Sequence, residues 1–118
     1  MTAFQFYKTL GEQQVTPKQK YISATNTNTV VWTPTTSMRI AVTHLSISTN
    51  PGGTIQFWFG GANQIRLAEF EMAASSTIFP VIGSWESTAT DAPLFAVASQ
   101  NGTGNGWSIT AEGFELIP

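Results

Sequence analysis

Few residues in this 118-residue chain have the type and spacing that catalysis requires. His44 is the only histidine and would have to carry any catalytic triad or histidine-based metal site, but no neighbour in the sequence is suited to orient it. Glu69 and Glu71 would share one face of a strand, where two carboxylates can act as acid and base in glycoside hydrolysis. The same spacing is typical of a solvated strand face. We therefore expect structural or surface roles for these residues and no enzymatic activity.

Motifs for cofactors and metals are missing as well. The chain has no cysteine, which rules out disulfides and thiolate metal sites. The glycine-rich run 102–106 lacks the Lys-Ser/Thr ending and the following helix of a phosphate loop, so it is interpreted as a hairpin tip. We expect no bound cofactor and no metal.

Aromatic side chains are the stronger candidates for binding a partner. Three aromatics, Phe4, Phe6 and Tyr7, fall within four residues of an N-terminal segment that has little other pattern. Trp58 lies on the strand face opposite the one that carries the large apolar residues around it, and Trp85 lies in a polar stretch. An exposed tryptophan can anchor a protein interface or stack on a sugar ring. These five residues are the predicted partner-binding side chains.

The charge of the chain is low. Charged residues make up 10% of the sequence, against about 25% in an average protein, and the formal net charge is -2. Such a weak field cannot hold a phosphate backbone through counterion release, so we expect no nucleic-acid partner. A surface with so few charges is also poorly protected from self-association. We therefore expect other proteins to cover much of it. No apolar run approaches the roughly 20 residues of a membrane helix and no signal peptide is evident, so we expect no membrane partner.

The distribution of residue types predicts an all-β protein. β-Branched and aromatic residues are frequent, and Gly, Pro, Asn and Ser break the chain about every ten residues. We expect a single antiparallel β-sandwich of the jelly-roll type at residues 19–118, preceded by an extended N-terminal arm at residues 1–18. The arm contains one short expected strand near residues 4–7. The other expected strands cover residues 20–25, 29–33, 37–49, 54–59, 64–72, 77–82, 93–99 and 107–116.

Several local features refine this prediction. The apolar phase slips by one residue near Thr43-His44, which predicts a β-bulge there, and Gly113 permits a second irregularity. Pro80 predicts an edge position or a bend for its strand. The polar residues 83–92 predict a loop. Residues 93–99 predict a strand that is buried on both faces. Trp32 and Trp107 are expected in the core.

Four stretches of sequence carry a resemblance to a known group of proteins. They are Met38-Arg-Ile-Ala-Val-Thr-His-Leu-Ser-Ile-Ser48, Thr54-Ile-Gln-Phe-Trp-Phe59 after a glycine-rich turn, Pro93-Leu-Phe-Ala-Val97, and Trp107-Ser-Ile-Thr-Ala-Glu-Gly-Phe-Glu115. Over residues 19–117 the chain resembles small β-sandwich virion proteins of tailed bacteriophages. Members of that group serve as capsid decoration proteins or as minor proteins of heads and tails. The resemblance is one of pattern and composition, and it transfers no functional residues.

The resemblance implies a function that agrees with the composition. We expect a non-enzymatic virion structural protein, a capsid decoration or cement protein that binds the major capsid protein or other virion subunits. It would act as a homo-oligomer, with a trimer as the first expectation, in a virion assembled in the host cytoplasm. The alternative is a carbohydrate-binding module on a phage tail or a bacterial surface, with Trp58 and Trp85 facing a glycan.

Overall fold

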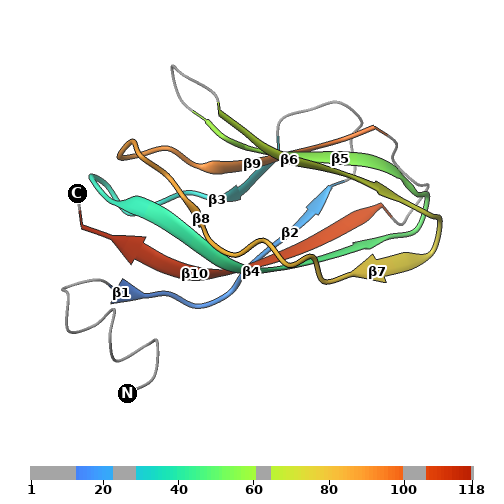
Figure 1. Ribbon diagram of the computed structural model, residues 1–118, viewed down its shortest axis with the longest axis horizontal. Helices are drawn as coiled ribbons and strands as arrows, with labels where there is room; N and C mark the ends of the chain where they lie inside the picture. Colours follow the sequence, from blue (N-terminus) through green and yellow to red (C-terminus); the bar gives the residue numbers. More distant parts are fainter. Residues whose placement is uncertain (1–12, 23–28, 61–64, 100–105, 118) are drawn as a thin grey trace.

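A computed structural model describes residues 13–22, 29–60, 65–99 and 106–117 of the chain (Figure 1). Phe4, Phe6 and Tyr7, the strand expected near them, and most of the glycine-rich tip lie outside the described residues. The described residues form strands and turns without a helix, which confirms the all-β class. Among them there is accordingly no helix long and apolar enough to cross a membrane.

The strands form two antiparallel sheets that pack against each other in a β-sandwich-like arrangement (Figure 1). Sheet A has the order β1-β10-β4-β7, with β2 also on β10 and β8 also on β4; its strands are β1 (Gln13–Gln14), β2 (Lys18–Ile22), β4 (Arg39–Thr49), β7 (Ser76–Ile78), β8 (Trp85–Glu86) and β10 (Trp107–Leu116). Sheet B has the order β3-β9-β5-β6; its strands are β3 (Thr29–Trp32), β5 (Gly53–Phe59), β6 (Ile65–Met72) and β9 (Leu94–Ala98).

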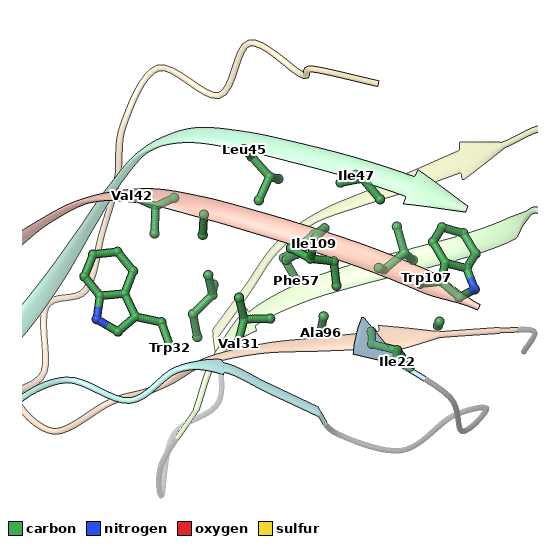
Figure 2. Packing of buried hydrophobic residues seen from close by; sticks show 14 of the residues in the cluster. Ile22, Val31, Trp32, Val42, Leu45, Ile47, Phe57, Ala96, Trp107 and Ile109 are labelled. Carbon is green, nitrogen blue, oxygen red and sulfur yellow. The ribbon is translucent and has the colours of Figure 1, made fainter. Parts of the chain in front are cut away.

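The core lies between the sheets, because apolar side chains alternate inward along the long strands (Figure 2). Trp32, Trp107 and Phe57 are its largest fully buried side chains, as expected for both tryptophans. Strand β5 shows the alternation most clearly, since its apolar residues Ile55, Phe57 and Phe59 are buried while the residues between them are half-buried. Burying a large apolar side chain contributes about 1.5–3 kcal/mol, so this alternation fixes which face of each strand points inward.

The predicted bulge on β4 is confirmed. Glu112 lies opposite His44 and Gly113 lies opposite Val42, which leaves Thr43 as the extra residue. The bulge shifts the side-chain phase, so Val42 and Leu45 both face the core although they are three residues apart. Glycine is required at position 113, because a Cβ atom there would lie 1.9 Å from the carbonyl oxygen of Ala41.

Three local predictions were wrong in part. The strand expected at residues 77–82 ends at Ile78, because Pro80 lacks an N–H for pairing, although its edge position is confirmed. The loop expected at residues 83–92 contains the short strand β8, which pairs with β4. Strand β9 is buried on its inner face only, since Phe95 and Val97 on its outer face are half-buried.

The paired sheet begins inside the segment that the sequence assigns to the N-terminal arm. Gln13 and Gln14 of β1 lie opposite Glu115 and Phe114 of β10, and Lys18 of β2 lies opposite Ala111. Gln13, Gln14 and Lys18 therefore pair within sheet A, and the backbone N–H of Val15 donates to the carbonyl of Gly113 at 3.5 Å. Residues 1–12 lie outside the described residues.

Replacing Gly113 by alanine tests the close approach at the bulge. We expect Gly113→Ala to lower the free energy of unfolding by about 1–3 kcal/mol, because the β4 and β10 backbones must separate to admit the methyl group. Urea denaturation followed by tryptophan fluorescence measures the change. Ser108→Ala, at an exposed position of the same strand, is the matched control and should shift stability little. An unchanged midpoint for Gly113→Ala would contradict this account of the bulge.

Candidate binding surfaces

The titratable groups of the described residues are engaged with neighbours or face solvent. His44 lies exposed on the outer face of sheet A, with its Nδ1 3.0 Å from the Thr43 hydroxyl. Glu115 is buried, and its carboxylate accepts hydrogen bonds from the backbone N–H and the hydroxyl of Thr35, at 2.5 and 2.7 Å. Glu69 and Glu71 are both exposed, as expected for a solvated strand face. In the described part of the chain, no three His, Asp or Glu side chains gather as metal ligands.

Trp58 lies half-buried on the outer face of sheet B, which is the face predicted for it. On β9 it lies opposite Phe95, and on β6 it lies opposite Arg66. Its indole Nε1 donates to the Gln56 side-chain oxygen at 3.2 Å, and the Gln56 amide donates to Glu69 at 2.8 Å. Hydrogen bonds therefore hold the ring edge of Trp58 against a polar network on this face.

A register shift in β6 completes that network. Between Phe57 and Trp58 the pairing moves from Ala68 to Arg66, so Leu67 is the extra residue. In a regular strand, residues three apart face opposite sides, but the shift places Arg66 and Glu69 on one face. Their side chains form an ion pair at 3.2 Å. Because this ion pair is exposed, it holds the two side chains in place but adds little to the free energy of unfolding.

Trp85 occupies a different environment from Trp58. It lies in β8, half-buried, and its ring packs on Phe57 with centroids 5.7 Å apart and a tilt of 42°. Phe57 belongs to the core between the sheets, so Trp85 closes the side of the core beside β4. The two tryptophans therefore belong to different sheets and face different neighbours, and the structure does not bring them together as one platform.

A hollow lies on sheet A, where the chain between β7 and β8 runs beside β4. We call it the β4 groove; its volume is about 500 Å³. Residues 79–83 form one wall, and the other lining residues are Thr43, His44, Leu45, Ser46, Thr110 and Glu112. Two apolar side chains of the wall are strongly exposed, Phe79 at 75% and Val81 at 100%.

The β4 groove exists because β7 and β8 pair with separate parts of β4. Strand β7 pairs with residues 47–49 of β4, and β8 pairs with residues 41 and 42. Among the described residues, positions 43–46 of β4 have no strand partner on this edge. Pro80 lies in the middle of the connecting segment and prevents it from continuing β7 as a regular strand.

Sequence reasoning missed the β4 groove. Its lining comes from three parts of the chain, 43–46, 79–83 and 110–112, that only sheet pairing brings together. The signal in the sequence was the apolar run Phe79-Pro80-Val81-Ile82, whose proline indicated that the strand does not continue. Of the predicted partner-binding residues, Trp58 and Trp85 lie elsewhere on the molecule, and Phe4, Phe6 and Tyr7 lie outside the described residues.

Comparisons with known proteins add no assignment. No protein-family model, no curated protein and no solved structure matches the chain.

Two substitutions should separate a structural aromatic from an exposed one. We expect Trp85→Ala to lower the free energy of unfolding by about 2–3 kcal/mol, somewhat less than a fully buried tryptophan, because its ring packs on Phe57. Phe79→Ser should change stability by less than about 0.5 kcal/mol, since its side chain lies mostly in solvent. Urea titration of both variants measures the difference. Equal losses in the two variants would contradict the assigned environments.

Proposed function

We propose that the chain is a non-enzymatic virion structural protein, a capsid decoration or cement protein that binds and stabilises the assembled phage head. The observation that carries the proposal is a weakly charged, two-sheet domain that leaves Phe79 and Val81 in solvent beside a groove. Exposed apolar side chains that cluster at a groove are typical of a surface that another protein covers. The chain would then act in the virion, after assembly in the host cytoplasm.

The order of the strands supports a jelly-roll connectivity within this proposal. From β2 to β10 the chain places β2, β4, β7 with β8, and β10 in sheet A, and β3, β5, β6 and β9 in sheet B. The orders β2-β10-β4-β7 and β3-β9-β5-β6 are those expected when two Greek keys wrap into eight strands. Jelly rolls occur in viral capsid proteins and in lectins, so the fold agrees with either candidate function and decides neither.

A decoration protein acts by mass action. Because it binds the assembled lattice and not free subunits, every bound copy lowers the free energy of the lattice relative to its dissociated state. Its partners would be the major capsid protein or other virion subunits, and a homo-oligomer would engage several of them at once. We propose a trimer, since threefold positions of a lattice match that symmetry, with the segment before β1 acting as an extended N-terminal arm.

Purified virions test this function. The proposal predicts that the chain cosediments with virions produced by the phage that encodes it, in amounts that scale with the major capsid protein. Phe79→Ser combined with Val81→Ser should reduce this binding at least about tenfold, because copies that lose roughly 1.4 kcal/mol of apolar contact with one another no longer engage several virion subunits at once. Glu71→Gln, exposed on the other sheet, is the control and should bind normally. Virions that lack the chain would overturn the proposal.

Carbohydrate binding is the second candidate, and Trp58 favours it. Sugar-binding sites combine an aromatic face with amide, carboxylate and guanidinium groups, and Gln56, Glu69 and Arg66 surround this tryptophan. Trp58→Ala should abolish binding to a glycan array, whereas Trp85→Phe, which keeps the core packed, should retain it. If the wild-type chain binds no glycan, this candidate is rejected.

A further inference from the structure

We propose that the β4 groove of one subunit binds residues 1–12 of a second copy of this chain. The inference rests on the proposed function, which requires a homo-oligomer, and it names the contact that would join the copies. It assigns a partner to Phe4, Phe6 and Tyr7 and to the exposed loop at Phe79 and Val81.

The β4 groove is suited to an extended, apolar segment. Phe79 and Val81 provide an apolar wall that is 75% and 100% exposed. His44, Ser46 and Thr110 provide polar groups on the neighbouring strands. Positions 43–46 of β4 also have no strand partner on this edge among the described residues, so main-chain groups of an incoming segment can pair there.

The sequence of residues 1–12 matches these features. In an extended conformation, Phe4, Phe6 and Lys8 lie on one side of the chain and Tyr7 on the other. The two phenylalanines are apolar like the wall formed by Phe79 and Val81, and Lys8 carries the charge opposite to that of Glu112, which also lines the groove. In the described part of the chain the only ion pair joins Arg66 and Glu69, so Glu112 has no cationic partner there.

The direction of β1 indicates that residues 1–12 bind the groove of a second copy and not the groove of their own chain. Gln13 lies opposite Glu115 and Gln14 opposite Phe114, so the N-terminal end of β1 points toward the C-terminal end of β10. The groove lies at Thr110 and Glu112, in the opposite direction along β10. Twelve extended residues span up to about 40 Å, close to the largest extent of the molecule, 44 Å. A segment of that length that continued in the direction of β1 would lead away from the groove of its own subunit.

Engineered cysteines test the contact, because the native chain contains none. Full-length Gln5→Cys chains, which keep both phenylalanines, are mixed with differently tagged Ser46→Cys chains and oxidised. We expect a disulfide between the two kinds of chain, at least about tenfold above a mixture with Glu71→Cys chains, because a bound segment raises the local thiol concentration to about millimolar. Glu71 is exposed on the other sheet and serves as the matched control position.

Further variants test the specificity of the disulfide. Phe4→Ser combined with Phe6→Ser in the Gln5→Cys chain should reduce its yield to that of the control. Lys8→Glu or Glu112→Lys alone should weaken oligomerisation about two- to fivefold, as expected for an exposed ion pair, and the two together should restore it. Equal disulfide yields at positions 46 and 71 would overturn the inference.

The outcome separates this inference from the proposed function. If the chain is present in virions but the disulfide does not form, the inference fails and the virion role stands. If the disulfide forms but purified virions lack the chain, the copies associate as proposed here and the virion role fails.

Discussion

The pairing of β4 with β10 is the constraint on which the rest of the molecule depends. It runs from Trp107 opposite Thr49 to Leu116 opposite Arg39, and every other strand of sheet A is attached to one of these two. The bulge at Thr43 lets both halves of β4 present apolar side chains to the same core, and Gly113 allows the backbones to approach there. Thr43 and the next three residues of β4 also line the β4 groove, so the irregular part of this strand contributes to the candidate interface.

The sequence predicted the features that depend on local pattern. The alternation of Ile55, Phe57 and Phe59 indicated the inner face of β5, and the phase slip near Thr43 indicated the bulge, because each signal lies within one strand. The register shift at Leu67 was not predicted, because it depends on the pairing of β6 with β5. The groove was not predicted for the same reason, because its lining comes from three separate segments of the chain that only sheet pairing brings together. The fold class could therefore be predicted from the sequence, whereas the β4 groove could not.

The surface chemistry explains why binding is a better proposal than catalysis. His44 and the glutamates face solvent or hold neighbouring groups, whereas the two most exposed large apolar side chains, Phe79 and Val81, lie side by side at the β4 groove. With few charges to keep copies apart, such a surface favours association with other proteins. The Trp58 face differs, because hydrogen bonds to Gln56 and a nearby ion pair make it polar. The two faces therefore differ in chemistry, with exposed apolar side chains at the β4 groove of sheet A and a polar network around Trp58 on sheet B.

Light scattering of the purified full-length chain over a range of concentrations tests the central claim most directly. A subunit made for assembly should give a concentration-independent mass three times the 12.7 kDa of the chain. That mass would agree with lattice sites of threefold symmetry and with contacts between copies. A mass of 12.7 kDa at every concentration would contradict the account and leave a monovalent binding module as the better description.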